Sequence, residues 1–312
     1  MKISVVIPVY NAEKYIRAAV HSALQFEEVN EVILVEDHSP DNALAICREL
    51  EAENERVKLF QHEGGINKGA GASRNLGIQK ATGPYVAFLD ADDLFLPNRF
   101  DAEKKLFSEN SRFDAMYGAQ GIHFYSEEAK ARHAAHFPKK FTVVRDFKKG
   151  ESMFEELLGM NKTRRGHIHL DTLTVNKEIL DQMPFHFREN LRLHQDYEFT
   201  IRLSYYAQVL PGILDQPIAS RGVHLDNRYT QVGFKEKKYY RNQVLVWESL
   251  QKWGKQEAIA RAYRRLITRR WYAYQIGGAS FFKSWMLFFK YLLKEWTVIK
   301  EFRIYYRTIL NR

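Results

Sequence analysis

Carboxylate side chains cluster directly after one apolar run. Residues 85–89 have the pattern of a buried strand, and Asp90, Asp92 and Asp93 follow at once. Because alternate side chains of an extended backbone point the same way, the Asp-x-Asp pair of Asp90 and Asp92 shares one side. Such carboxylates repel one another unless a cation neutralises them, and Mg²⁺ bound by one or two carboxylates keeps positions free for phosphates. The pattern predicts a Mn²⁺ or Mg²⁺ site at Asp92 and Asp90. A solvated turn with an aspartate helix cap is the alternative.

Strand and helix patterns alternate over the first hundred residues and would position these carboxylates. Apolar runs predict strands at 3–9, 31–36, 57–60 and 85–89, and helical spacing predicts helices at 12–24, 41–53 and 70–80. Strands that alternate with helices of this length pair in parallel through right-handed crossovers. Ligands of such sheets bind beyond the carboxyl ends of the strands. Tyr10, the Glu36–Asp37 pair and the Asp90–Asp93 cluster are therefore expected to converge on one crevice.

The rest of the chain divides into two parts. From 96 to 233 the pattern is mixed, with short strands, longer loops and a helix predicted at 195–207. Beyond 233, helices are predicted at 236–253 and 255–276, followed by an amphipathic stretch at 281–309. We expect a catalytic domain over 1–233, with a nucleotide-binding half (1–100) and an acceptor half (101–233), and a helical extension over 234–312.

The overall composition excludes several classes of protein. The chain has 312 residues, of which 45% are hydrophobic, enough for one α/β domain with an appendage. The chain has one cysteine, which excludes disulfides within the chain and zinc sites of several thiolates. This residue, Cys47, lies in a helical pattern and is interpreted as core packing. No apolar run is long enough for a membrane span, and the start resembles no signal peptide. A cytoplasmic location is expected.

Positive charge is concentrated in the last part of the chain. The net charge is +9, and residues 234–312 contain 18 Lys and Arg against 5 Glu and no Asp, together with all five tryptophans. One helical face there is predicted to be apolar, formed by Phe281, Trp285, Phe288, Leu292, Trp296 and Ile299. This face could pack on the catalytic domain, or it could contact an anionic membrane surface peripherally. No nucleic-acid-binding motif is present, so nucleic acid is not an expected partner.

Four segments, in this order, carry a family resemblance. They are ISVVIPVYN (3–11), LVEDHSPD (34–41), NKGAGASRN (67–75) and FLDADD (88–93). Together they closely resemble the family 2 glycosyltransferases of the GT-A fold, strongly over 1–100, at a few points to about 230, and not beyond. The resemblance implies an α/β fold with a Rossmann-like, mostly parallel sheet and helices on both faces. It also implies an inverting, metal-dependent transfer of a sugar from a nucleoside-diphosphate donor, favouring UDP-sugars. The hydroxyl acceptor would be a saccharide or a lipid-linked molecule of surface polysaccharide or glycolipid synthesis.

The resemblance also implies which residues hold the donor. Those expected around the base and the diphosphate are Pro8, Tyr10, Glu36, Asp37, Arg74, Asn75 and Asp90. Where the family typically has Asp-Asp-Gly-Ser-x-Asp, this chain has Glu36 for the first Asp and His38 for Gly, so contacts to the donor base are expected to be altered. Arg74 suits the role on physical grounds too, because its planar cation can make two parallel contacts to oxygens. A surface arginine on a helix is the alternative.

Two later segments match the family at single points. Arg221-Gly-Val-His224 resembles its Arg-x-x-His, which places Arg221 at the donor and lets His224 complete the metal site or touch the diphosphate. An imidazole ligand would favour Mn²⁺ over Mg²⁺, whereas a histidine on a surface loop is the alternative. The segment around Asp196 matches the family's acidic pair, with Gln195 for the first acid, and implies Asp196 as the general base. A helix N-cap role for Asp196, or His194 as the base, remains open.

Two other functions share parts of this pattern. One is a nucleotide-sugar-binding protein without turnover, against which the presence of Asp92 and Asp196 argues. The other is a nucleotidyltransferase, which would need a glycine-rich triphosphate loop containing Lys or Arg directly after the first strand. Residues 10–15 contain no such loop. The sequence therefore favours the glycosyltransferase.

Overall fold

A computed structural model describes residues 1–109, 111–136, 152–160, 166–225 and 237–310. Contacts group the chain into two units. The first unit comprises Met1–Glu189 and Phe199–Asn227, and the second comprises Asn190–Glu198 and Arg228–Arg312. The domain boundary expected at 233 stays a prediction, because grouping by contacts does not show which part folds on its own.

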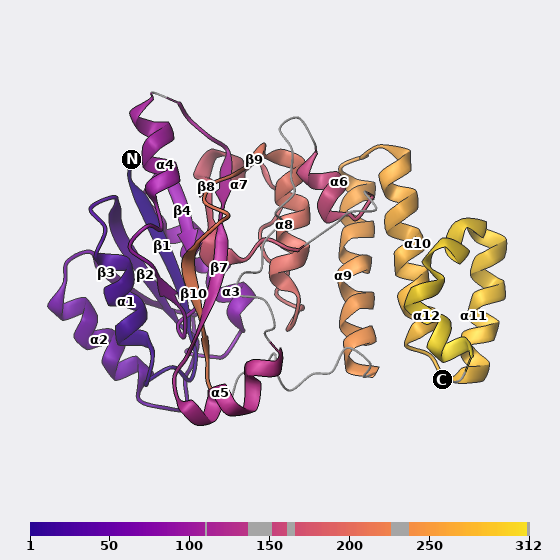
Figure 1. Ribbon diagram of the computed structural model, residues 1–312, viewed down its shortest axis with the longest axis horizontal. Coiled ribbons are helices and arrows are strands. Elements are labelled where there is room, and N and C mark those ends of the chain that lie inside the picture. The colour runs from indigo at the N-terminus through magenta and orange to yellow at the C-terminus, as the bar shows by residue number, and fades with distance from the viewer. Residues whose placement is uncertain (110, 137–151, 161–165, 226–236, 311–312) are drawn as a thin grey trace. The chain divides into compact units, whose positions relative to one another are not determined.

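The first unit opens with the predicted alternation of strands and helices. Its elements are β1 (Ile3–Val9), α1 (Ile16–Leu24), β2 (Val29–Glu36), α2 (Ala43–Glu53), β3 (Val57–Gln61), α3 (Ala70–Lys80) and β4 (Tyr85–Phe88). Strand β1 pairs in parallel with β2 and β4, and β2 pairs in parallel with β3. These pairings give the spatial order β3-β2-β1-β4, as expected of right-handed crossovers from a central strand (Figure 1).

Later elements extend this sheet and add a second one. They are β5 (Leu94–Phe95), α4 (Asp101–Ser108), β6 (Ala115–Tyr117), β7 (Ala119–Phe124), α5 (Glu127–His133), η1 (Ala134–His136), α6 (Met153–Leu157), η2 (Leu170–Thr172), β8 (Leu173–Asn176), α7 (Lys177–Gln182), β9 (Val209–Pro211) and β10 (Pro217–Val223). Strand β8 pairs antiparallel with β4 and β6, which completes a sheet in the order β3-β2-β1-β4-β8-β6-β9. The smaller sheet has the order β5-β10-β7.

Helices cover both faces of the large sheet. On β1, Val5 and Ile7 belong to a core cluster that includes α1 and α2 residues, Cys47 among them. Val6 points to the other face, where Gly77 of α3 approaches so closely that an added Cβ would lie 2.2 Å from a Val6 methyl group. This alternation is the period of a strand buried on both faces. The expected α/β class, with its mostly parallel sheet, is confirmed, and Cys47 is core packing.

The second unit is helical over its C-terminal part. It contains α9 (Lys237–Gln256), α10 (Arg261–Gly277), α11 (Phe281–Lys294), η4 (Trp296–Glu301) and α12 (Phe302–Ile309), while α8 (Gln195–Tyr206) begins in this unit and continues into the first. The amphipathic stretch expected at 281–309 is not one helix. It breaks at Glu295, whose carboxylate accepts the Thr297 N–H at 3.2 Å. None of the helices that the structure describes could cross a bilayer, since each is too short or too polar.

The predicted apolar face does not continue across this break. On α11 the buried side chains are Ser284, Leu287 and Tyr291, one step around the helix from the predicted set. Phe281 and Trp296, two members of that set, are exposed. The prediction that all six residues share one helical face was wrong, because α11 ends before Glu295 and the residues after it face another direction.

Candidate active site

The predicted polar clusters lie at one edge of the large sheet. Register pairs Val9 with Glu36 at the ends of β1 and β2, and it pairs Phe88, the last residue of β4, with Val6, three residues before the end of β1. Pro8 is the second-last residue of strand β1, and Tyr10 follows the strand with 39% of its surface exposed. The aspartates 90–93 follow β4 at the same edge. This register supports the expectation that the three clusters face one ligand site, because ligands of parallel sheets bind beyond the carboxyl ends of the strands.

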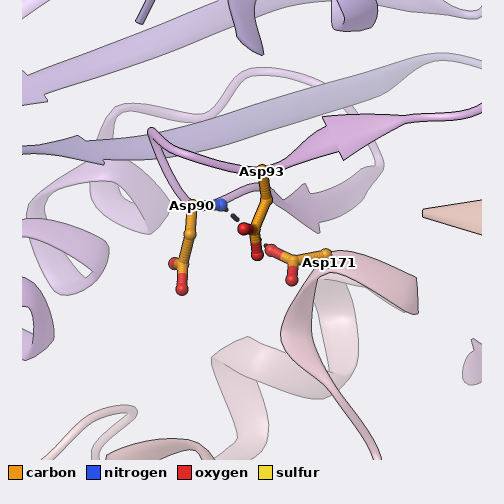
Figure 2. Close-up of side chains that lie close together, drawn as sticks. All are labelled: Asp90, Asp93 and Asp171. Carbon is orange, nitrogen blue, oxygen red and sulfur yellow. Dashed lines mark hydrogen bonds between the residues drawn. The ribbon is translucent and has the colours of Figure 1, made fainter. Parts of the chain in front are cut away.

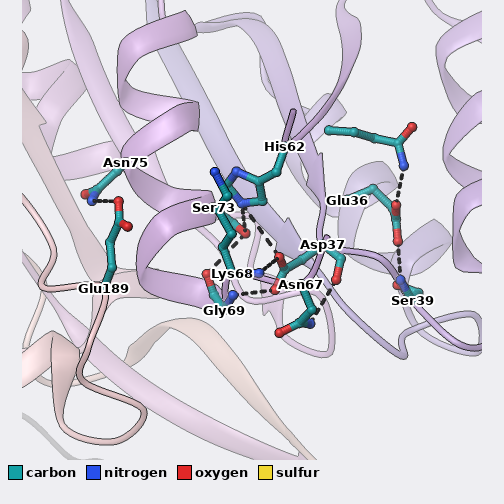
Figure 3. Close-up of polar contacts among 11 residues, drawn as sticks. Glu36, Asp37, Ser39, His62, Asn67, Lys68, Gly69, Ser73, Asn75 and Glu189 are labelled. Carbon is teal, nitrogen blue, oxygen red and sulfur yellow. Dashed lines mark hydrogen bonds and ion pairs between the residues drawn. The ribbon is translucent and has the colours of Figure 1, made fainter. Parts of the chain in front are cut away.

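Glu36 and Asp37 are buried, and both oxygens of each carboxylate accept hydrogen bonds from the protein. Glu36 accepts the Ser39 N–H at 2.6 Å and the Gln61 side-chain amide at 2.7 Å. Asp37 accepts the backbone N–H groups of Lys68 and Gly69, both at 2.7 Å. Figure 3 shows these contacts converging on Asp37 from the loop that precedes α3. The two acids thus hold the loop that follows β2 and the loop that precedes α3.

The loop held by Asp37 leads directly into the helix of Arg74. Gly69 has φ of +90°, a backbone conformation that favours glycine, and it precedes the first residue of α3. His62 Nε2 lies 3.6 Å from Asp37 Oδ1 and 3.1 Å from the Ser73 hydroxyl. His62 therefore links Asp37 to Ser73, the residue before Arg74 in α3. Asp37 therefore positions the start of α3.

Arg74 and Asn75 point to different partners. Arg74 Nη2 lies 2.5 Å from Asp90 Oδ1, and its guanidinium also stands over the Phe187 ring, 5.5 Å from the centroid. Asn75 accepts the Phe187 N–H at 2.8 Å and donates to the Phe187 carbonyl at 2.9 Å. Arg74 thus lies at the carboxylate cluster, whereas both ends of the Asn75 amide hold the backbone before α8.

Three aspartates form a tight cluster beside β4. Figure 2 shows Asp90 and Asp93 from the strand-end segment meeting Asp171 of η2. Ligand oxygens of the three lie within 4.8 Å of one another. Asp171 accepts the Asp90 N–H at 2.9 Å and the Gln120 side-chain amide at 2.5 Å. Asp93 accepts the Gly222 N–H at 2.8 Å. The oxygens of Asp93 and Asp171 are therefore largely committed within the protein.

A proton and two arginines offset the charge of this cluster. Burial raises the pKa of Asp93 well above its usual range, and the neighbouring carboxylates Asp171 and Asp92 raise it further. Burial also raises the pKa of Asp171, to about 6. The Asp93 carboxyl donates to Asp171, a contact that favours the protonated form of Asp93 and the ionised form of Asp171. Burial alone would lower the pKa of Arg221, but the surrounding aspartates raise it, which keeps this cation charged beside them.

Asp92, the second acid of Asp-x-Asp, lies apart from the cluster and pairs with His224. His224 Nε2 is 3.1 Å from Asp92 Oδ2, and the Asp92 side chain keeps 32% of its surface exposed. The His224 ring stacks on Tyr15 at 4.8 Å between centroids, and the Tyr125 hydroxyl donates to the Asp92 carbonyl at 3.1 Å. The predicted metal ligands Asp92 and His224 are thus brought together, with a carboxylate edge open to a ligand.

Gly222 makes the approach of these two segments possible. An added Cβ at Gly222 would lie 2.0 Å from the Asp92 carbonyl oxygen. Contacts of that length do not occur between real atoms, so any larger residue would displace the Asp92 backbone. The glycine within Arg221-Gly-Val-His224 therefore sets the position of Asp92 as well as that of His224.

Asp196 is the second residue of α8, within its first turn. Its side chain is half-buried, and because the helix begins at Gln195, Asp196 stands inside the first turn and not at the N-cap position. A carboxylate in a first turn is stabilised by the helix dipole. His194, the other candidate base, has φ of +62°, and burial lowers the pKa of its imidazole.

Sequence reasoning missed several residues at this site. Asp171, Gln120, Tyr15, Tyr125 and Arg99 contact the aspartates or their partners; Arg99, for example, donates to the Asp171 carbonyl at 2.9 Å. Asp171 stands in the 3₁₀ turn before β8, a strand that pairs with β4. Only that antiparallel pairing brings it to the carboxylate edge, and no local motif marks it.

The chain was compared with known families and curated proteins. The family model described as glycosyl transferase family 2 matches residues 4–168. An uncharacterised glycosyltransferase of Rickettsia conorii is 35% identical over 139 residues, which cover 43% of this chain and 21% of that protein. The Escherichia coli protein UDP-Glc:alpha-D-GlcNAc-diphosphoundecaprenol beta-1,3-glucosyltransferase WfgD is 34% identical over 117 residues, covering 37% of this chain and 44% of WfgD. Each match thus spans less than half of the relative.

Two longer similarities concern most of the chain. An uncharacterised glycosyltransferase of Methanocaldococcus jannaschii is 26% identical over 262 residues, which cover 79% of this chain and 84% of that protein. The crystal structure of S. aureus TarS 1-349 in complex with UDP-GlcNAc aligns with a TM-score of 0.57 at 19% identity, covering 88% of this chain and 73% of that one. At this identity the likeness shows the fold, and it agrees with the GT-A fold expected from the motifs.

Proposed function

The chain belongs to glycosyl transferase family 2, and from that premise we propose that it transfers a sugar from a nucleoside-diphosphate donor to a hydroxyl acceptor. The observation that carries the proposal is the pairing of Asp92 with His224 at 3.1 Å, beside a carboxylate cluster that also holds Arg74. This arrangement offers both a cation site and fixed positive charge at the sheet edge where donors bind.

A divalent metal fits the Asp92 and His224 pair better than it fits the Asp90, Asp93 and Asp171 cluster. Neighbouring ligands of an octahedral ion at about 2.1 Å stand roughly 3 Å apart, which agrees with the 3.1 Å separation of Nε2 and Oδ2. Within the cluster, two arginines, Arg74 and Arg221, already offset part of the charge. We assign Asp92 and His224 as ligands, with Asp90 nearby, and favour Mn²⁺ because of the imidazole. The metal would stabilise negative charge on the diphosphate.

Other residues at the edge would hold the donor. Tyr10 is exposed beside the ends of β1 and β2, where an aromatic ring can stack on a base. Glu36 and Asp37 would act by fixing the loops around that base, and Asn75 by fixing the backbone at Phe187. Arg74 and Arg221 would offset charge on the leaving diphosphate.

The transfer itself would be a single in-line displacement with inversion. Asp196 would accept the proton of the acceptor hydroxyl as its oxygen forms a bond to the anomeric carbon. The bond between that carbon and the diphosphate oxygen would break at the same time, and the nucleoside diphosphate would leave with both electrons. No covalent intermediate on the protein is needed.

The acceptor is proposed to be a saccharide or a lipid-linked molecule of surface polysaccharide synthesis. The printed activity of WfgD concerns a diphosphoundecaprenol acceptor and a UDP-glucose donor, which supports this class by relationship. We also propose that the basic second unit contacts an anionic membrane surface peripherally, since residues 234–312 carry 18 Lys and Arg against 5 Glu.

A turnover assay with a panel of donors tests the function. The protein is incubated with Mn²⁺ and UDP-, GDP- or dTDP-sugars, with and without saccharide and lipid-linked acceptors, and release of nucleoside diphosphate is measured. We expect release with one donor class that stops on chelation and returns with Mn²⁺. Donor binding without release under any acceptor would support the nucleotide-sugar-binding alternative. Release of inorganic pyrophosphate from a nucleoside triphosphate and a sugar phosphate would indicate a nucleotidyltransferase.

A further inference from the structure

A basic cavity lies within the second unit, separate from the aspartates of the first. Its volume is about 540 Å³, and it opens between the end of α9, the start of α10 and the end of α11. Its charged lining residues are Lys255, Arg261, Arg264, Arg265, Lys294 and Glu295. Five cations therefore surround one cavity with a single carboxylate among them.

Most of this positive charge is not offset by the protein. Arg265 pairs with Glu295 at 2.7 Å, and this hydrogen bond lowers the pKa of Glu295 to about 2. Among the residues that the structure describes, the other four cations of the cavity form no ion pair. Like charges that line one recess focus a positive potential into it and attract an anion. The cavity thus suits a ligand with more than one negative charge.

The backbone adds to this potential. Helix α10 begins at Arg261, and its N-cap residue, Ala260, has no side chain that could accept a hydrogen bond from the first turn. The N–H groups at a helix start carry partial positive charge, and phosphate oxygens are acceptors that suit them. Together with arginine guanidinium groups, which match phosphate geometry in two-point contacts, this lining favours phosphate over a simple carboxylate.

An exposed apolar stripe runs along the helix that ends at the cavity. On α11, Phe282, Met286, Phe289 and Leu293 follow one another at helical spacing and are 85%, 60%, 56% and 90% exposed. The opposite side of α11, with Leu287 and Tyr291, is buried. Figure 1 shows α11 beside α10 and α12 at the end of the chain. Large side chains exposed in one row mark an interaction surface.

The stripe and the cavity adjoin each other in the chain. Leu293 ends the stripe and Lys294 lines the cavity, while Glu295 of the cavity precedes Trp296, which is 60% exposed. A ligand that binds both the basic cavity and the apolar stripe must carry a phosphate group and an apolar part. A second copy of this chain would bring the same basic surface and be repelled by it, and a soluble phosphate would leave the stripe in water.

We infer that this cavity binds the phosphate of an anionic lipid headgroup while the α11 stripe enters the apolar layer of the same membrane. The inference rests on the proposed membrane contact and gives it a specific site. Lys294 and Arg264 hold the headgroup from two helices. Phe289 and Leu293 supply an apolar contribution that salt does not weaken.

Vesicle co-sedimentation of the full chain tests the cavity. Vesicles of phosphatidylcholine are compared with vesicles that also contain phosphatidylglycerol, at low and high salt. The double variant Arg264→Gln/Lys294→Gln should bind the anionic vesicles roughly 100-fold more weakly, since each charge-assisted hydrogen bond to the phosphate contributes about tenfold. The matched control Lys237→Gln/Lys238→Gln removes two exposed cations at the other end of α9, about 27 Å along that helix from Lys255, and should lose far less.

A second variant tests the stripe. Phe289→Ser/Leu293→Ser should abolish the binding that the wild-type chain retains at high salt, with unchanged circular dichroism because both side chains are more than half exposed. If this variant instead dissociates a dimer seen by light scattering and keeps its vesicle binding, a second copy covers the stripe and the lipid assignment is overturned.

Other outcomes separate the cavity from the broader proposals. If the two glutamine double variants lose vesicle binding equally, the attraction is due to diffuse positive charge. The proposed cavity site would then be wrong, whereas the proposed membrane contact would still hold. Inorganic pyrophosphate without metal should displace the wild-type chain from vesicles. If pyrophosphate binding depends on Arg264 and Lys294 but anionic vesicles are ignored at low salt, the ligand is a soluble phosphate and the lipid assignment fails. Glycosyl transfer, measured separately with a soluble acceptor, should survive the cavity variant.

Discussion

Nε2 of His224 lies 3.1 Å from Oδ2 of Asp92, although 132 positions separate the two residues in the chain. β10 carries His224 to this point, because it pairs with β5, the short strand that follows Asp92. The Tyr15 ring stacks on the imidazole and limits its rotation. A side chain held in this way is prepared for a ligand before the ligand arrives, which lowers the entropy cost of binding.

Replacing either residue should weaken Mn²⁺-dependent binding of UDP. For Asp92→Asn and for His224→Ala we expect a loss of about tenfold or more, the scale on which altered metal environments act, with binding measured by calorimetry with and without Mn²⁺. His21→Ala, an exposed histidine on α1, is the matched control and should bind as wild type does. Unchanged UDP binding by Asp92→Asn would show that the metal lies elsewhere, with Asp90, Asp93 and Asp171 as the next candidates.

Asp196→Asn should abolish transfer while preserving donor affinity. The amide keeps the shape of the side chain but cannot accept the proton, and loss of a general base costs about 10²- to 10⁴-fold in rate. Initial rates and donor dissociation constants are to be compared with those of His194→Ala, which tests the other candidate base. Should His194→Ala lose the rate and Asp196→Asn retain it, the assignment of the base would be reversed.

Gly222→Ala should displace the backbone at Asp92, because Gly222 is buried against it. The new Cβ would lie 2.0 Å from the Asp92 carbonyl, and forced shifts of this kind cost about 1–3 kcal/mol. The prediction is a lower free energy of unfolding together with weaker Mn²⁺ dependence, read from denaturant titrations and UDP binding. Gly64→Ala serves as control: it has φ of +77° but open space around its Cβ, so it should show backbone strain alone.

The proton shared by Asp93 and Asp171 should make stability depend on pH. Burial raises the folded-state pKa of both carboxyls, of Asp171 to about 6. A raised pKa means that this contribution is complete below the unfolded value near 4 and declines as pH rises through the folded value. The free energy of unfolding should therefore fall as pH rises from about 4 to about 6, where Asp171 titrates, at up to about 1.4 kcal/mol per pH unit for each proton.

Asp93→Asn should flatten this dependence. The amide can accept from Gly222 N–H and donate to Asp171, as the protonated carboxyl does, but it does not ionise. Urea titrations at several pH values compare it with Asp215→Asn, which removes an exposed carboxylate and should follow the wild-type curve. A variant curve parallel to wild type would mean that Asp93 is ionised across this range.

Local patterns along the sequence were sufficient to predict the strands and helices that position the candidate site. The alternation of apolar runs with helical spacing over residues 3–89 is a short-range property, and parallel pairing follows from it because each helix returns the chain to the end of the sheet where the previous strand began. The structure confirms those strands and helices, with β1 between β2 and β4 in the sheet. The motifs at the strand ends led to the family that the comparisons then showed. The roles of Asp92, Asp196 and the donor residues remain predictions.

Tertiary pairing decided what the sequence could not. Asp171 reaches the aspartates because β8 runs antiparallel beside β4, and no residue near Asp171 in the chain signals that neighbour. Burial among carboxylates, which depends on every surrounding element, gives Asp93 its proton. On α11, spacing correctly predicted a helix with an apolar face, yet packing selected Leu287 and Tyr291 for burial and left Phe289 and Leu293 in water. Periodicity specifies that a face exists, whereas the partner helices determine which residues that face contains.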